Sequence, residues 1–406
     1  MHKQKNLEVQ VEKPIFFESC LYRGPLEKAI NTARHFGFTL IEPMTITKRL
    51  PATITKAKKV ALKEKDFSDF PRDYMSTLKK YIDDELHKFA QPVLFCHVIN
   101  KNNNESELRL EIVGTKKSVA EATVIKAAHS ILEELGHTDI CVRLNTIGDK
   151  ESGNVFLREL TSYYREHMTS FSPTLQQQIK KDILKIYSNT SEKYRDINVG
   201  APKPINFLTE ESRVHFAEIL DFLENLEINY EIGDDLVGTS SCFPKTLYEI
   251  VERRENSEGV RALASGERYN YLAQNIGFNK KLPIVGIAIK IQRKGKQKDK
   301  YLKNAPESPK IYFIHLGPDA KKRGLRILDI FKKSGIRAHQ SLCHDSFTTQ
   351  LRMAQTAGVP YTMIMGQKEV IENSIIFRDT ETRYQEIIAL PDLEDFLKNL
   401  QKRRAL

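Results

Sequence analysis

A strongly apolar helical segment lies between two segments in which apolar and polar residues alternate. The helix is expected over residues 118–135, where Ser118 and Glu121 have the spacing of a capping box. The alternation at 108–112 and 140–144 is typical of strands that turn one face toward a core and the other away from it. A helix and strands in this order bury their apolar faces against each other. The pattern therefore predicts an α+β domain with an antiparallel sheet.

The remaining periodicities divide the chain into further parts. Residues 152–226 are expected to be helical, and strands are expected again at 228–232, 246–251 and 283–291. The helical stretch is therefore an insertion into a strand-based domain. A lysine-rich stretch with two prolines, 290–310, indicates a linker, and strands alternating with helices beyond it predict a small parallel or mixed sheet. The predicted parts are a core of residues 1–150 and 228–293, a helical insertion of 151–227, a basic linker of 294–310 and an α/β domain of 311–406.

The net charge of +10 favours a polyanionic partner, because each phosphate contact by Lys or Arg releases counterions. Solubility alone is the alternative interpretation of the charge. No apolar run of about 18 residues is present, so no membrane-spanning helix is expected. The five cysteines include no CxxC pair, and the N-terminus carries no apolar signal segment. These features predict a cytoplasmic protein without a disulfide framework or a metal site.

Local motifs do not identify a function. Cys343, His344 and Asp345 have the residue types of a nucleophilic triad, but three successive residues diverge along the chain, so no catalysis is expected there. His97 in an apolar strand is interpreted as a packed or surface residue, since the histidines show no metal-ligand spacing. The linker is either a solvated tether or a contact to a phosphate backbone.

Two segments resemble histidyl-tRNA synthetases. Residues 144–149 (LNTIGD) precede the helical insertion, and residues 208–216 (LTEESRVHF) follow it. That family joins its class II catalytic core to such an insertion through an Asn-(Ser/Thr)-Ile-Gly turn and a Leu-x-x-Glu-Ser-x-x-His-Phe helix. Five further segments resemble parts of the same family, in the family's order. Residues 37–43 resemble its first motif, and residues 111–114 resemble the end of its second motif. Residues 264–270 resemble its Ala-Gly-Gly-Arg-Tyr-Asp stretch, residues 283–289 its third motif and residues 311–406 its anticodon-binding domain.

The resemblance implies a class II synthetase-type antiparallel sheet core with a helical insertion, and a C-terminal α/β domain of the anticodon-binding type. It also implies a homodimer formed through the core and tRNA or another RNA as partner. ATP with Mg²⁺ is implied if any activity remains. By their position in the tail, Arg352, Gln367, Glu369 and Arg378 are candidates for tRNA contacts.

The sequence departs from the family where the amino acid is activated. The second motif of the family carries an Arg for the α-phosphate in a hairpin about ten residues longer than the one at 98–107 here. Lys101 is the nearby cation, and Lys lacks the bidentate fork that fits a phosphate edge. In the third motif Arg293 remains where the family contacts the γ-phosphate, whereas Lys290 and Gln292 replace a small residue and a Glu.

Two further elements of the amino-acid site are altered. The histidine signature Leu-Val-Arg-Gly-Leu-Asp-Tyr-Tyr corresponds to residues 236–243, in which Gly238 replaces the Arg. Ser241 replaces the Asp, and Cys242 and Phe243 replace the tyrosines. An Arg-Pro-Glu element is reduced to residues 71–73 (PRD). Each lost contact to the transition state costs roughly 10²–10³ in rate.

A residual pocket is the remaining site hypothesis. Arg109 and Glu111 lie on the polar side of one strand, near Glu107, and Arg268 with Tyr269 belongs to the Ala-Gly-Gly-Arg-Tyr-Asp-like stretch. Together they could line a site for an anionic or zwitterionic molecule. A surface salt-bridge cluster is the alternative.

Three functions follow from these observations. The favoured one is a synthetase-like protein, a diverged paralogue with impaired catalysis that acts by binding tRNA or another RNA. The second is a working histidine–tRNA ligase with a remodelled pocket. The third is a regulatory subunit of a histidine-biosynthesis enzyme, like the synthetase-like subunit of ATP phosphoribosyltransferase, and the presence of residues 311–406 counts against it because that family ordinarily lacks this domain.

Overall fold

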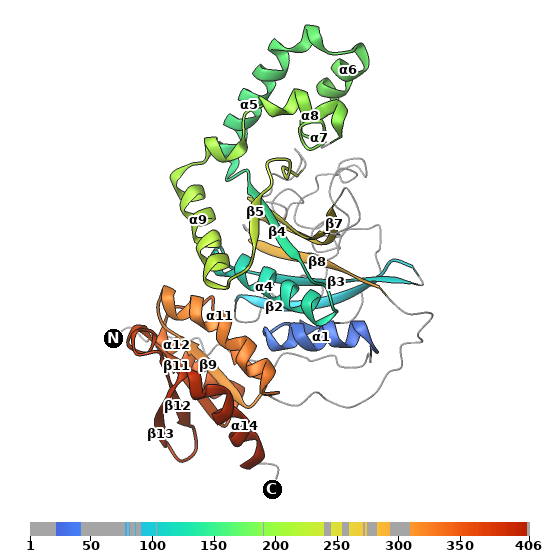
Figure 1. Ribbon diagram of the computed structural model, residues 1–406. Coiled ribbons are helices and arrows are strands. Elements are labelled where there is room, and N and C mark those ends of the chain that lie inside the picture. The colour runs from blue at the N-terminus through green and yellow to red at the C-terminus, as the bar shows by residue number, and fades with distance from the viewer. Residues whose placement is uncertain are drawn as a thin grey trace, which may run out of the picture.

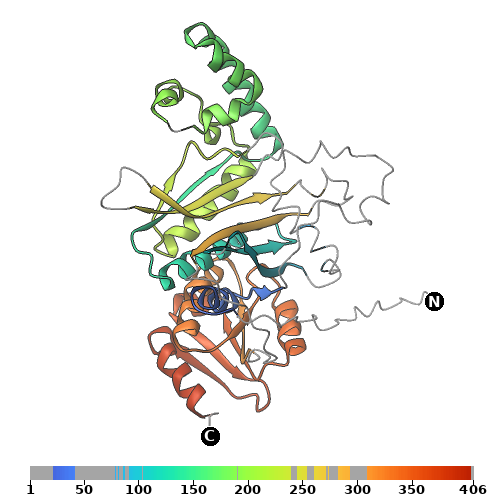
Figure 2. The ribbon, with the colours of Figure 1, turned by 90° about the vertical axis from the view of Figure 1, so that its right-hand side faces the viewer.

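The computed structural model places three parts one after another along the molecule: the helical insertion, the core and the C-terminal domain (Figure 1, Figure 2). No described helix is long and apolar enough to cross a membrane. The structure describes residues 22–41, 91–102, 104–189, 191–238, 245–253, 260–270, 282–292 and 309–403, with Leu78, Tyr81, Leu86 and Ala273.

The core is built on an eight-stranded sheet with the order β1-β2-β3-β8-β7-β6-β4-β5. Its six inner strands run antiparallel, as the alternating segments predict. The outermost pairs β1–β2 and β4–β5 are parallel, so the sheet is mixed at both edges and the antiparallel prediction is wrong there. The strands are β1 Thr39–Leu40, β2 Val93–Asn100, β3 Glu105–Val113, β4 Ile140–Thr146, β5 Tyr230–Ile232, β6 Thr246–Arg253, β7 Val260–Tyr269 and β8 Ile284–Gln292.

Helix α4, Val119–Glu134, is the central helix of the core and confirms the predicted apolar helix. Helices α1, Pro25–His35, and α9, Glu210–Asn225, pack against it, and therefore even its polar residues are buried. The predicted capping box is wrong: Ser118 makes no capping bond, and its hydroxyl instead donates to Glu218 over 2.6 Å.

The helical insertion has a hydrophobic cluster of its own. It comprises α5 Lys150–Glu166, α6 Pro173–Lys181, α7 Ile183–Tyr187 and α8 Glu192–Val199, with single-turn segments η3 Met168–Ser170 and η4 Pro204–Phe207. Phe156, Leu160 and Tyr164 of α5 are fully buried in this cluster. Helix α9 lies within the predicted range of the insertion, 151–227, but its buried side chains belong to the hydrophobic cluster of the core.

The C-terminal domain, residues 309–403, contains a five-stranded sheet with the order β10-β9-β11-β12-β13. Strand β9 pairs parallel with β10 and β11, whereas β12 pairs antiparallel with β11 and with β13. The sheet is therefore mixed, in agreement with the prediction of a parallel or mixed sheet. Strands β12 and β13 and helix α13 are additions to the elements expected from the sequence. The elements are β9 Ile311–His315, α11 Pro318–Lys333, β10 Ala338–Gln340, α12 Phe347–Ala357, β11 Tyr361–Met365, α13 Gln367–Ile371, β12 Ser374–Asp379, β13 Gln385–Ala389, η5 Leu390–Asp392 and α14 Leu393–Arg403.

Helix α11 attaches the C-terminal domain to the core. Its apolar side chains share one buried cluster with α1, α4 and α9. Charged pairs surround this cluster: Lys126 of α4 lies 2.7 Å from Asp329, and Lys332 lies 2.5 Å from Glu134. The two domains of the described chain are therefore packed against each other through apolar and ionic contacts.

Candidate functional site

Glu107, Arg109 and Glu111 lie on the face of the core sheet opposite to α4. Strand β3 alternates, so Leu108 and Leu110 enter the core cluster while the three charged residues point the other way. Their exposed fractions are only 9%, 6% and 0%, respectively. The alternative of a surface salt-bridge cluster is therefore wrong for these three residues, because the polar face of β3 is covered.

Two described cations of this face pair with a carboxylate, whereas Lys290, the register partner of Glu107, is exposed and donates to the Ala262 carbonyl over 3.2 Å. The Arg109 guanidinium donates to Glu107 over 2.6 Å, and Lys101 lies 3.2 Å from the same carboxylate. Lys101 belongs to the turn between β2 and β3, where its backbone N–H donates to Glu105. The two strands stay paired up to Asn100 and Ser106, so the hairpin is as short as the sequence indicates.

Glu111 lies over Gly286 of the neighbouring strand β8, its register partner. A Cβ atom at Gly286 would lie 2.1 Å from Glu111 Oε2, so the carboxylate occupies the space that a side chain there would need. Tyr269 lies on the same face, and its hydroxyl donates to Glu111 over 3.4 Å. The structure thus brings Glu107, Arg109, Glu111 and Tyr269 together on one covered polar face.

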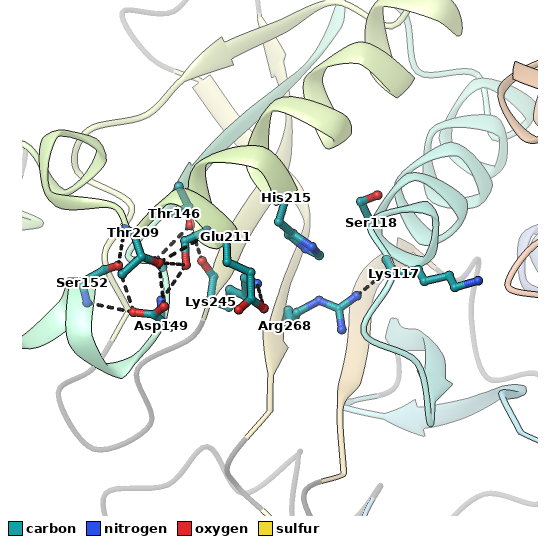
Figure 3. Close-up of polar contacts among 12 residues, drawn as sticks. Lys117, Ser118, Thr146, Asp149, Ser152, Thr209, Glu211, His215, Lys245 and Arg268 are labelled. Atoms are coloured by element: carbon teal, nitrogen blue, oxygen red, sulfur yellow. Dashed lines mark hydrogen bonds and ion pairs between the residues drawn. The ribbon is translucent and has the colours of Figure 1, made fainter. Parts of the chain in front are cut away.

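Arg268 lies on the opposite face of the sheet and is not part of this group. It precedes Tyr269 in β7, and successive residues of a strand point to opposite faces. Its guanidinium is 0% exposed and donates to both carboxylate oxygens of Glu121 on α4, each over 2.5 Å. It also donates to the carbonyl of Thr115 and to that of Lys117 (Figure 3). The prediction that Arg268 lines the residual pocket is therefore wrong, and its contacts give it a structural role.

The buried carboxylate of Glu121 is held in its ionised form. Burial opposes ionisation, but the charge of Arg268 and the hydrogen bonds from Arg268 and His215 outweigh it and lower the pKa of Glu121 to about 2. His215 Nε2, on α9, lies 2.8 Å from Glu121 Oε1. This cluster connects β7, α4 and α9.

The two connections between the core and the insertion meet at Asp149 (Figure 3). Its carboxylate caps α5 by accepting from the Ser152 backbone N–H over 2.9 Å, and it accepts from the Thr209 hydroxyl over 2.7 Å. Thr209 is itself the N-cap of α9 and bonds Ser212. Asp149 is not among the predicted site residues, although its position directly before a helix is a capping signal.

The four tail candidates come from three elements. Arg352 on α12 and Gln367 on α13 are exposed, and Arg378 on β12 is half-buried. Glu369 is buried, and its carboxylate accepts from the Gly366 backbone N–H over 2.8 Å, so its contact in this structure is a helix cap.

Several sequence candidates lie outside the described residues: Arg293, residues 71–73, Ser241, Cys242, Phe243 and nearly all of the linker 294–310. Within the described part, Gly238 has a φ of 65°, a left-handed conformation that favours glycine.

Comparisons with known proteins bear on both domains. Residues 310–400 match the family model of the anticodon binding domain. The histidine–tRNA ligase of Lysinibacillus sphaericus is 26% identical over 295 residues, covering 71% of this chain and 68% of the relative. That of Halothermothrix orenii is 26% identical over 342 residues, covering 81% of each.

Solved structures of the same kind are also similar. The apo histidyl-tRNA synthetase of Staphylococcus aureus matches with a TM-score of 0.48 and 17% identity, covering 92% of this chain and 94% of the other. A Bacillus halodurans protein described as an ATP phosphoribosyltransferase regulatory subunit/histidyl-tRNA synthetase matches with a TM-score of 0.43 and 13% identity, covering 88% and 98%.

The structure thus combines a mixed sheet with antiparallel inner strands, a buried helix and an α/β tail that matches the anticodon binding domain. Over 71–81% of its length the chain is similar to histidine–tRNA ligases, at 26% identity.

Proposed function

We propose that this chain is a histidyl-tRNA-synthetase-like protein that binds tRNA or another RNA and has lost most of its ability to activate histidine. RNA binding is supported by the match of residues 310–400 to the anticodon binding domain and by the net charge of +10. The loss of activation is supported by the ion pairs on the sheet face where a histidyl-tRNA synthetase would hold its substrates.

The observation that carries the proposal is the pairing of Lys101 and Arg109 with a carboxylate on that face. ATP brings several negative charges, and its transfer chemistry needs cations directed at the phosphates. Lys101 and Arg109 are instead paired with Glu107, and the hairpin that holds Lys101 is short. Gly238 stands where the family signature has an Arg. Neither Lys101 nor Arg109 is therefore directed at a triphosphate.

A working histidine–tRNA ligase is the second candidate. The similarity to the Halothermothrix orenii ligase over 81% of this chain favours it. In that case Arg293 is the proposed γ-phosphate contact, with ATP and Mg²⁺ as cofactors. The regulatory subunit is less well supported, because the anticodon-type domain is present. For each of these functions we propose a cytoplasmic homodimer formed through the core. Light scattering after gel filtration measures the molar mass and so tests whether the chain is a dimer.

RNA binding is tested by an electrophoretic shift with total tRNA across a series of salt concentrations. If Lys and Arg contact phosphates, the logarithm of the binding constant falls with the logarithm of salt, by roughly 0.7–0.9 for each phosphate neutralised. We expect a steep slope that corresponds to several contacts. Flat or absent binding contradicts the RNA-binding half of the proposal.

The loss of activation is tested separately by histidine-dependent exchange between ATP and pyrophosphate. No exchange above the background without enzyme is expected. Clear exchange selects the ligase alternative instead, whatever the outcome of the tRNA shift.

A further inference from the structure

One ionic contact between the core and the C-terminal domain differs from the others in its composition. Lys117, in the loop before α4, and Lys321, in α11, both pair with the carboxylate of Asp345. The Lys321 side chain is only 8% exposed, whereas that of Asp345 is 69% exposed. Two ammonium groups thus meet one carboxylate that faces solvent, and the contact keeps a net positive charge.

Asp345 lies at the position in the C-terminal sheet where parallel α/β sheets commonly bind ligands. Strand β9 lies between β10 and β11 in the sheet. The chain therefore leaves β9 toward one side, to reach β10, and leaves β10 toward the other side, to reach β11. Crevices outside the carboxyl ends of strands at such a switch point are the usual ligand sites of open α/β sheets. Lys321 follows β9 in the first turns of α11, and Asp345 lies in the loop after β10.

The buried side chain of Gln350, which is 0% exposed, holds the loop that carries Asp345 through hydrogen bonds. The Gln350 side-chain amide donates to the carbonyl of His344 over 3.2 Å and to that of His315 over 2.7 Å. The facing core loop is equally fixed, because the buried Arg268 guanidinium donates to the carbonyl of Lys117 over 3.0 Å. Both sides of the contact are therefore preorganised.

Ammonium groups this close together repel each other and need an anion between them. A desolvated Lys321 makes that need greater, since a buried charge without a partner is costly. An RNA phosphate oxygen offers the same kind of acceptor as a carboxylate oxygen, and solvent can reach the position that Asp345 holds. The net charge of the contact also favours an incoming anion over the single carboxylate already present.

We propose that Lys117 and Lys321 form a subsite for an RNA backbone phosphate at the junction of the two domains, and that Asp345 occupies this subsite in the RNA-free chain. The inference rests on the proposed RNA binding and adds a site that includes the core as well as the anticodon-type domain. An RNA bound there contacts both domains at once, and Asp345 lowers its affinity by competing for the two ammonium groups.

The substitution Asp345→Asn tests this competition, and Asp329→Asn is its matched control. Both remove one negative charge from an ion pair between the core and the C-terminal domain. With total tRNA as probe, D345N is expected to bind about threefold or more tightly than the wild type. Its salt slope should steepen by roughly 0.7–0.9, the value for one added phosphate contact. D329N should leave both quantities near those of the wild type.

The lysines provide the reciprocal test. Lys117→Ala is expected to weaken tRNA binding and to abolish the gain seen in D345N, whereas Lys322→Ala, which removes a cation paired with Asp221, should not abolish it. Lys117 is partly exposed, so K117A is expected to fold, which a thermal melt checks.

Equal gains in D345N and D329N contradict the inference, because they reflect net charge alone. If the wild type binds no tRNA, the proposed function fails, and D345N still decides the subsite. Binding gained by D345N alone supports the subsite, and no gain overturns it.

Discussion

Replacing Arg268 with Ala tests the structural role that its contacts assign to it. The substitution leaves the Glu121 carboxylate 0% exposed with His215 as its remaining partner, and it removes the donors to the carbonyls of Thr115 and Lys117. Removing one partner of a buried ion pair costs about 3–5 kcal/mol of unfolding free energy. Typical domains are stable by only about 5–15 kcal/mol, so the core of the variant should unfold at a much lower urea concentration.

The assay is urea unfolding followed by circular dichroism, which suits a chain without tryptophan. Arg253→Ala is the matched control, because Arg253 pairs with Glu231 at the surface, with exposed fractions of 57% and 42%, and should lose less than about 1 kcal/mol. The double variant Arg268→Met with Glu121→Leu should recover most of the loss, since no buried charge then lacks a partner.

The effect of Arg268→Ala should also depend on pH. The folded protein lowers the pKa of Glu121 from 4.5 to about 2, so this group stabilises the fold fully above pH 4.5 and loses its contribution as the pH falls toward 2. The difference in unfolding free energy between wild type and variant should therefore be large at neutral pH and shrink below pH 4.5. A variant within about 1 kcal/mol of the wild type at neutral pH, or a difference of equal size at pH 3 and pH 7, would refute this reasoning.

Two further substitutions test other contacts of the core. Gly286→Ala places a methyl group 2.1 Å from Glu111 Oε2 and should destabilise the core by about 1–3 kcal/mol in the same urea assay; an unchanged midpoint contradicts the close approach. Asp149→Ala removes the cap of α5 and the bond from Thr209, with an expected loss of about 1–2 kcal/mol. Ser191→Ala, at a helix start without a capping bond, should change stability by less than about 0.5 kcal/mol, and equal losses would refute the role of Asp149.

The regular elements of the fold could be predicted because their periodicities are strong. The helix after Gly114, the alternating strand β3 and the strand–helix alternation of the tail appear as the sequence indicates. The edge strands β1 and β5 are only two and three residues long. The strand predicted at 228–232 contains β5, but its residues do not show that it pairs parallel to β4. Strand β13 has its half-exposed pattern at the edge of a sheet, where burial leaves little trace in the sequence.

The site was harder to predict because its contacts are distant along the chain. Ser118 and Glu121 have the spacing of a capping box, but Glu121 is buried and pairs with Arg268, 147 residues away. The opposite orientation of Arg268 and Tyr269 follows from strand alternation, once both are placed in one strand. The pairing of Lys101 and Arg109 with Glu107 could not be predicted, because the sequence shows that these residues are neighbours but not that Arg109 and Glu107 are buried.

The proposed function combines a tail that binds RNA with the loss of the amino-acid-activating centre. Histidine-dependent ATP–pyrophosphate exchange tests this most directly when it is measured on the same preparation that shifts tRNA, with an active histidine–tRNA ligase as positive control. We expect a tRNA shift together with exchange at the background level. Exchange that requires both histidine and this chain would contradict this expectation.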